Sequence, residues 1–103
     1  MANKLAIVTG GSRGLGKSTA LALARAGVDV ILTYHSNAEA AREVVSEIDG
    51  IGARAAALQL DTGKAGSFAA FGEQLKELLA TTWQRADFDF LVNNAGVGVH
   101  ASF

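Results

Sequence analysis

Four glycines crowd into seven residues near the start of the chain, at positions 10, 11, 14 and 16. They follow the apolar run Leu5–Val8 and precede a stretch with helical spacing, so they stand between an expected strand and an expected helix. Glycine lets a ligand approach the backbone where a Cβ would block it, and a helix start attracts anions through its unpaired N–H groups. The segment therefore predicts a phosphate-binding turn, and a turn that merely reverses the chain is the less favoured interpretation.

Two phosphate-binding motifs compete for this turn. Gly11–Ser18 matches the Walker A pattern G-x-x-x-x-G-K-[ST]. In that pattern Lys17 would contact the β/γ-phosphates and Ser18 would bind Mg²⁺. The chemistry implied by this first motif is that of a P-loop nucleotide hydrolase or kinase.

The second motif takes Gly10, Gly14 and Gly16, which are spaced as G-x-x-x-G-x-G. The strict dinucleotide fingerprint G-x-G-x-x-G is not met, because Thr19 occupies the position of its third glycine. The wider spacing is similar to the glycine motif of the short-chain dehydrogenase/reductase family, whose members transfer hydride with a nicotinamide coenzyme.

Two further segments strengthen this resemblance. Asp61, just beyond the expected strand Ala55–Leu60, resembles the adenine-contacting Asp of the family, and Asn93–Gly96 matches its N-N-A-G motif without substitution. All three motifs stand at the carboxyl end of an expected strand, where open α/β sheets bind their ligands. The Walker interpretation leaves the Asn-rich motif unexplained. We therefore favour the dehydrogenase interpretation and keep the P-loop protein as the alternative.

The segment after the second expected strand bears on the choice between NADP and NAD. An NAD site usually has an acid there, which binds the ribose 2′-OH, but Tyr34, His35 and Ser36 are followed by no carboxylate before Glu39. In the family that the chain resembles, members that prefer NADP carry a basic residue before the second motif glycine, and Arg13 holds that position. A guanidinium suits a phosphate because it can form bidentate, charge-assisted hydrogen bonds. We therefore expect NADP rather than NAD.

The resemblance implies a coenzyme site whose members lie beside the strand ends. They are Gly10, Ser12, Arg13, Gly14, Leu15, Gly16, Tyr34, His35, Ser36, Asp61, Thr62, Asn93, Ala95 and Gly96.

The residues that carry out hydride transfer in this family are missing from the chain. They are a Ser, a Tyr-x-x-x-Lys pair and an additional Asn, but Ala38 stands four residues after the single tyrosine, Tyr34. We therefore predict no catalytic residue here, and we expect residues 1–103 to be the truncated dinucleotide-binding domain of a longer enzyme. That enzyme would exchange hydride between the nicotinamide and a small carbonyl or alcohol substrate, for example a 3-oxoacyl group. A non-catalytic dinucleotide-binding module is a further alternative.

The elements that must position these residues alternate along the chain. Strands are expected at Leu5–Val8, Val28–Thr33, Ala55–Leu60 and Phe88–Val92. Helices are expected at Gly14–Ala26, from a capping box at Ser36–Glu39 to Gly50 and Gly52, and at Ala65–Thr82. This order predicts an α/β fold of the Rossmann type, a doubly wound parallel sheet with strand order 3-2-1-4 and three crossover helices. Relative to the family fold this sheet would be incomplete.

Three packing details follow from the same pattern. The first helix should bury a stripe made of Leu15, Thr19, Leu23 and Ala26. Trp83 and Phe88 should close the core around the third helix. Phe90 and Val92 should lie on an open sheet edge, which in a longer chain would be paired.

Composition excludes several classes of function. Nine Lys and Arg against ten Asp and Glu give a net charge of −1, which leaves no basic surface for nucleic acid or an anionic membrane. Half of the residues are hydrophobic and only 18% are charged, so the chain is too apolar for a disordered segment. The absence of Cys and the two distant histidines argue against a metal site. We expect a cytoplasmic domain without a membrane segment, belonging to a protein that is a homo-oligomer in its full-length form.

Overall fold

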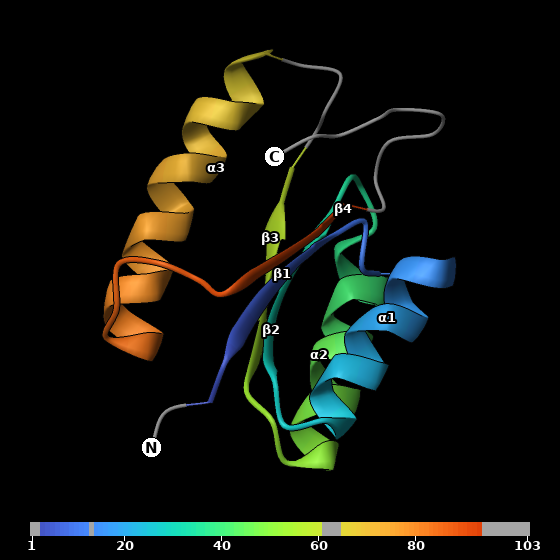
Figure 1. Cartoon of the computed structure of the whole chain (residues 1–103). Coiled ribbons are helices and arrows are strands. Elements are labelled where there is room, and N and C mark those ends of the chain that lie inside the picture. The colour runs from blue at the N-terminus through green and yellow to red at the C-terminus, as the bar shows by residue number, and fades with distance from the viewer. Residues whose placement is uncertain (1–2, 13, 61–64, 94–103) are drawn as a thin grey trace.

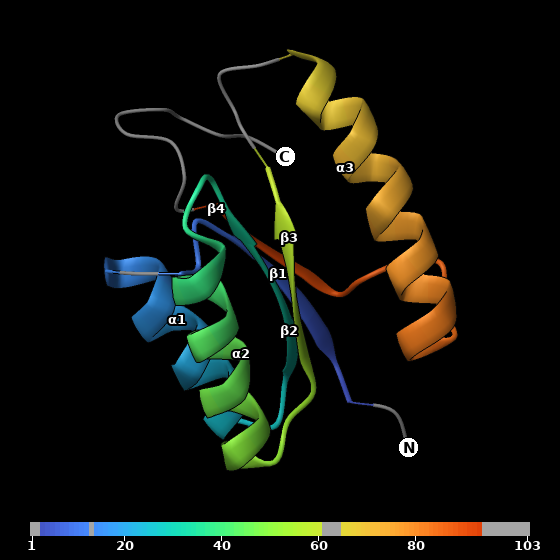
Figure 2. The ribbon, with the colours of Figure 1, turned by 180° about the vertical axis from the view of Figure 1, so that it is seen from behind.

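A parallel four-stranded sheet forms the centre of the structure, a computed structural model that describes residues 3–12, 14–60 and 65–93. The strands are β1 (Leu5–Thr9), β2 (Asp29–Tyr34), β3 (Ala55–Gln59) and β4 (Phe90–Asn93), in the order β3-β2-β1-β4. Helices α1 (Gly14–Arg25) and α2 (Ala38–Ile51) cover one face. Helix α3 (Ala65–Leu78) covers the other and continues as a π-helical turn, η1 (Leu79–Trp83) (Figures 1 and 2). The doubly wound α/β fold and the strand order predicted from the sequence are confirmed.

The two central strands are apolar at successive positions because both of their faces are covered. Side chains of a strand alternate between the two faces of the sheet. Val8, Val30 and Leu32 point to the core under α1 and α2, whereas Ile7 and Ile31 point to the core under α3 and η1. Since the strands are parallel and in register, the carboxyl ends of all four lie at one edge of the sheet.

Trp83 fulfils its predicted role, but Phe88 does not. Trp83 and Leu79, both from η1, are buried against β1 and β2. Phe88 is 37% exposed and precedes β4, which begins at Phe90. The prediction that Phe88 closes the core is therefore wrong, because the chain at that point still approaches the sheet. Phe90 is exposed on β4, an outer strand, as expected for an open edge, whereas Val92 is half-buried against the core under α1 and α2.

The buried face of α1 differs from the predicted one. The buried residues are Gly16, Ala20 and Ala24, spaced four apart, and their small side chains let the helix lie close to the sheet. Leu15 is 75% exposed and Ala26 lies beyond the end of the helix. The predicted stripe of Leu15, Thr19, Leu23 and Ala26 is therefore wrong at its two ends. Its middle residues, Thr19 and Leu23, are half-buried, and Leu23 packs against the core.

The ends of α2 also differ from the predicted caps. Asn37, and not Ser36, is the N-cap residue, because its Oδ1 accepts a hydrogen bond from the Ala40 N–H at 3.0 Å. At the other end Gly52 alone terminates the helix in the left-handed conformation, with φ 107°, while Gly50 lies within it.

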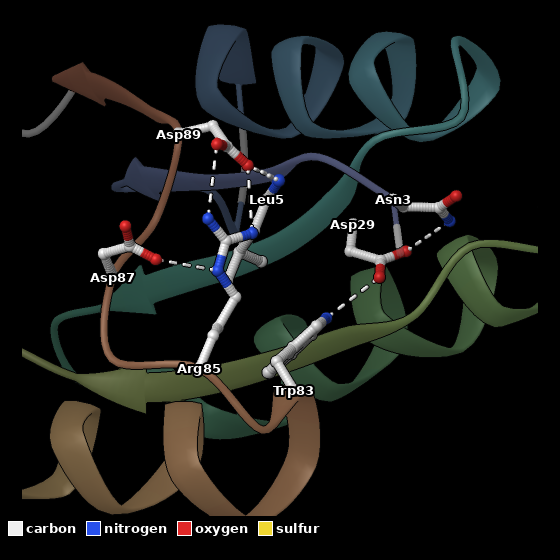
Figure 3. Close-up of polar contacts among 7 residues, drawn as sticks. All are labelled: Asn3, Leu5, Asp29, Trp83, Arg85, Asp87 and Asp89. Atoms are coloured by element: carbon white, nitrogen blue, oxygen red, sulfur yellow. Dashed lines mark hydrogen bonds and ion pairs between the residues drawn. The ribbon is translucent and has the colours of Figure 1, made fainter. Parts of the chain in front are cut away.

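A polar network fastens the amino ends of the strands to η1 (Figure 3). The Asp29 carboxylate, on a residue that is only 6% exposed, accepts three hydrogen bonds. Asn3 Nδ2 donates to Oδ1 at 3.1 Å, the Arg54 N–H donates to Oδ1 at 2.9 Å, and Trp83 Nε1 donates to Oδ2 at 2.9 Å. One carboxylate thus joins the start of β2, the segment before β3 and the π-helical turn.

A second carboxylate, that of Asp89, holds the segment before β4 against the start of β1 (Figure 3). Asp89 Oδ2 accepts hydrogen bonds from the Leu5 N–H at 2.8 Å and from Arg85 Nη1 at 3.0 Å. Arg85 Nε also donates to Asp87 at 3.0 Å. The chain between η1 and β4 is therefore held against the start of β1.

Acid is expected to weaken the fold through these two carboxylates. Burial favours a higher pKa for Asp29, but hydrogen bonds from Arg54, Asn3 and Trp83 outweigh it, so this pKa lies below its ordinary value. The pKa of Asp89 is lowered mainly by the hydrogen bonds from Arg85 and the Leu5 N–H. Carboxylates whose pKa is lower in the folded state give their full stabilisation above their unfolded pKa, about 4, and lose it as the pH falls through the folded value.

Urea unfolding at pH 7, 5, 4 and 3, followed by the fluorescence of the single tryptophan, measures this loss. The midpoint should hold between pH 7 and 5 and then fall. Asp49→Asn serves as the control, because this substitution leaves both networks intact and should keep the wild-type profile. A urea midpoint that is the same at pH 3 as at pH 7 would contradict the stabilising role given to the Asp29 and Asp89 carboxylates.

Candidate functional site

The glycine-rich turn between β1 and α1 has the backbone geometry that its sequence requires. Gly10 and Gly14 have φ values of 67° and 60°, in the left-handed region that other residues rarely adopt. Gly16 lies against the turn so closely that a Cβ there would be 2.1 Å from the Gly10 carbonyl oxygen. Each of the three motif glycines therefore has its own steric reason, and together they let α1 begin directly on top of the turn.

The end of β2 anchors the turn from the other side. The Gly10 N–H donates to Thr33 Oγ1 at 3.0 Å, and the Gly11 N–H donates to the Thr33 carbonyl oxygen at 3.0 Å. A Cβ on Gly11 would come within 2.7 Å of the Cβ of Leu32. An anion would therefore meet the amides that follow Gly11, at the start of α1.

Thr33 is a residue that the sequence interpretation missed. It is 2% exposed and sits in a strand whose other central residues are apolar. The signal that could have found it is a hydroxyl group in a doubly covered strand, next in space to a turn with many backbone donors.

The start of α1 fits a negatively charged group. The first turn of the helix holds no acidic residue, so nothing there competes for the positive end of the helix dipole. A Cβ on Gly14 would meet no atom within 4 Å, which leaves open space in front of the turn. Leu15, the next residue along the helix, is 75% exposed. The residues present therefore fit a phosphate group.

The position of Lys17 disfavours the Walker interpretation. Its Nζ lies 3.3 Å from Glu47 Oε2 on α2. The ammonium group is thus directed toward the neighbouring helix, whereas a Walker lysine contacts the phosphates held by the turn.

The segment after β2 is held by the end of β3. The Leu60 N–H donates to the Tyr34 carbonyl oxygen at 2.9 Å, and Gln59 Nε2 donates to the His35 carbonyl oxygen at 2.9 Å. The Tyr34 side chain is half-buried and lines an open cavity of about 470 Å³ beside α2. His35 and Ser36 are exposed. The main chain that follows β2 is therefore held by the end of β3.

Asn93 lies at the same edge of the sheet as the glycine turn. It pairs in register with Thr9, and Thr9 Oγ1 donates to Asn93 Oδ1 at 2.8 Å. This contact connects the end of β4 to the residue that precedes Gly10.

The structure brings most of the predicted site residues to one edge of the sheet, and Ser12 is half-buried within the turn. Five of the predicted residues fall outside the described part of the chain, namely Arg13, Asp61, Thr62, Ala95 and Gly96.

Among the described residues, no cluster of His, Cys, Asp and Glu could hold a metal ion. In the same residues no helix is both long and apolar enough to cross a bilayer.

Comparison with known proteins identifies relatives along nearly the whole chain. The family model described as short chain dehydrogenase matches residues 4–103. A 3-oxoacyl-[acyl-carrier-protein] reductase of Synechocystis sp. is 41% identical over 95 residues, which cover 91% of this chain and 36% of the relative.

Solved structures agree with this match. The angucycline C-6 ketoreductase LanV with bound NADP superimposes with a TM-score of 0.86 at 40% identity, over 91% of this chain and 37% of that protein. Acetoin dehydrogenase YohF from Salmonella typhimurium gives a TM-score of 0.78 at 36% identity, over 98% of this chain and 39% of that protein. The chain thus spans a little over a third of the length of these relatives. With the glycine turn, the sheet order and these matches in agreement, the chain belongs to the short-chain dehydrogenase family.

Proposed function

We propose that the chain binds NADP(H) and serves as the nucleotide-binding part of an oxidoreductase. The observation that carries the proposal is the turn between β1 and α1, where two left-handed glycines and the close approach of Gly16 to Gly10 leave an acid-free helix start open to an anion. A related ketoreductase has been solved with NADP bound, which supports the choice of coenzyme.

In the proposed site, different parts of the coenzyme bind beside the carboxyl ends of different strands. Amides at the start of α1, around Gly14 and Gly16, would hold the pyrophosphate, with Ser12 and Leu15 beside it. Arg13 would bind the 2′-phosphate, near the segment of Tyr34, His35 and Ser36. In the same assignment, the adenine would lie by Asp61 and Thr62, and the nicotinamide ribose by Asn93, Ala95 and Gly96. When bound, the nicotinamide would supply or accept the hydride.

We further propose that the whole enzyme acts on a small carbonyl or alcohol substrate. The relatives include a 3-oxoacyl-[acyl-carrier-protein] reductase and a ketoreductase, which favours reduction of a ketone, with a 3-oxoacyl group as one candidate. The catalytic residues would come from a part of the protein outside these 103 residues, because the sequence contains no Tyr-x-x-x-Lys pair. In this proposal residues 1–103 are a dinucleotide-binding domain of a longer, homo-oligomeric cytoplasmic enzyme.

Fluorescence titration with NADPH, NADH and ATP with Mg²⁺ tests the coenzyme assignment. NADPH should bind more tightly than NADH, and Arg13→Ala should weaken NADPH on the order of 10- to 100-fold, as expected for loss of a charged hydrogen bond. The same substitution should change NADH binding little, since NADH lacks the 2′-phosphate.

Lys17→Ala is the matched control, because it removes a positive charge that pairs with Glu47 at the surface. It should leave NADPH binding within about twofold of wild type, in keeping with the small energy of an exposed ion pair. Tighter binding of ATP than of NADPH, lost in Lys17→Ala and kept in Arg13→Ala, would replace the proposal with the P-loop alternative.

A further inference from the structure

We infer that Thr33 is a positioning residue, which sets the glycine turn in the conformation that binds the coenzyme. This inference rests on the proposed function. Thr33 contacts the turn at two points, since its Oγ1 accepts the Gly10 N–H and its carbonyl oxygen accepts the Gly11 N–H, both at 3.0 Å. One residue therefore fixes two successive peptide groups of the turn.

The hydroxyl has a specific task at this buried position. Thr33 is 2% exposed and lies near the carboxyl end of the inner strand β2, where Ile31 and Leu32 before it are fully buried. Packing alone would be satisfied by valine, which has nearly the same shape. Valine would, however, leave the half-buried Gly10 N–H without the acceptor that it now has, and a donor shielded from water without a partner is costly. The turn would then have to shift to find another acceptor.

A shift of Gly10 would be transmitted to the helix start. The same residue that donates to Thr33 places its carbonyl oxygen against Gly16, leaving no room there for even a Cβ. Gly10 is thus held between Thr33 and α1, so that a change on one side moves the other. The amides at the start of α1, which would hold the pyrophosphate, take their direction from this contact.

Thr33 also connects the two halves of the proposed site. The chain continues from it directly into Tyr34 and His35, whose carbonyl oxygens are fixed by Leu60 and Gln59. The phosphate turn and the segment beside the ribose are therefore set by one strand end. Their spacing, which a coenzyme must match with its pyrophosphate and its adenosine at once, depends on Thr33.

The test compares Thr33→Val with Thr33→Ser, with NADPH as the probe. Thr33→Val should raise the Kd for NADPH about tenfold, the factor that corresponds to roughly one hydrogen bond. Thr33→Ser retains the hydroxyl and should stay within about threefold of wild type. Val44→Ala is the stability control, because Val44 is buried in α2 away from the turn. It should lower the urea midpoint without changing the Kd.

Hydrogen exchange of the free chain provides a second measurement that needs no coenzyme. The Gly10 and Gly11 amides should be protected in the wild type, and Gly10 should lose its protection in Thr33→Val but not in Thr33→Ser. Unprotected amides in the wild type would overturn the inference even if Thr33→Val failed to fold.

The titration outcomes separate the two proposals. Equal NADPH binding by the wild type and Thr33→Val, or equal weakening by valine and serine, would overturn the role of Thr33 alone. Failure of the wild type itself to bind NADPH would instead overturn the proposed function.

Discussion

Gly16→Ala is expected to destabilise the chain by about 3 kcal/mol, the upper part of the range for an overpacked site. The added Cβ would lie 2.1 Å from the Gly10 carbonyl oxygen and 2.8 Å from the Gly10 carbonyl carbon. These are backbone atoms held in place by Thr33, so no flexible side chain is available to move aside. The free energy of unfolding in urea, followed by tryptophan fluorescence, measures the effect, and NADPH titration should show a parallel loss of binding.

Gly50→Ala is the matched control for this substitution. Gly50 lies in α2, and a Cβ there would meet nothing within 4 Å. Because alanine is the better helix former, this variant should be more stable than wild type by roughly 0.5–1 kcal/mol. If Gly16→Ala unfolded at the wild-type urea concentration, the close contact between α1 and the turn would be refuted.

Asp29→Ala is expected to cost about 3–4 kcal/mol of stability, because it removes the common acceptor of one buried and two part-buried hydrogen bonds. The Trp83 indole N–H, the Arg54 N–H and the Asn3 amide would all lose their partner at once. Urea unfolding gives the size of the effect. The tryptophan emission of the folded variant should also shift, since the indole loses its hydrogen bond to a carboxylate.

Asp87→Ala separates this effect from a general loss of negative charge. Asp87 is exposed and pairs only with Arg85 among the contacts described for it, so its removal should cost less than about 0.5 kcal/mol. The folded fraction of Asp29→Ala should bind NADPH as wild type does, because Asp29 begins β2 and the glycine turn lies at the opposite edge of the sheet. Wild-type stability in Asp29→Ala would refute the network as a fastening of η1.

The architecture could be predicted from the sequence because it depends on local patterns. Apolar runs such as Leu5–Val8 alternate with segments of helical spacing, and only a parallel sheet with crossover helices accommodates that order. The glycine turn could also be predicted, since Gly10 and Gly14 stand where the chain must adopt a left-handed backbone. The expected strands differ from the observed ones by only one or two residues at their ends.

What the sequence could not reveal are contacts between distant segments. Thr33 is 23 residues from Gly10, and Trp83 is 54 residues from Asp29, so no local spacing indicates either pair. The predicted buried face of α1 was wrong at Leu15 for a related reason. Leucine at position 15 outweighs glycine on any scale of hydrophobicity, yet close packing against the turn favours the smallest residue.

The error at the start of α2 has a simpler cause. Ser36 and Asn37 are adjacent and both types cap helices well, so a sequence pattern cannot choose between them. The predicted contacts of Arg13 and Asp61 lie outside the described residues and stay predictions.

The two-sided hold on Gly10 has a thermodynamic consequence for whatever binds beside it. Because Gly10 and Gly11 are already held by hydrogen bonds to Thr33 in the folded protein, the conformational entropy of these two residues is lost during folding and not during association. An incoming ligand then needs only to shed water and find its orientation. Discrimination beside these two residues then rests on the ligand's own shape and charge, and little on how far Gly10 and Gly11 would have to rearrange.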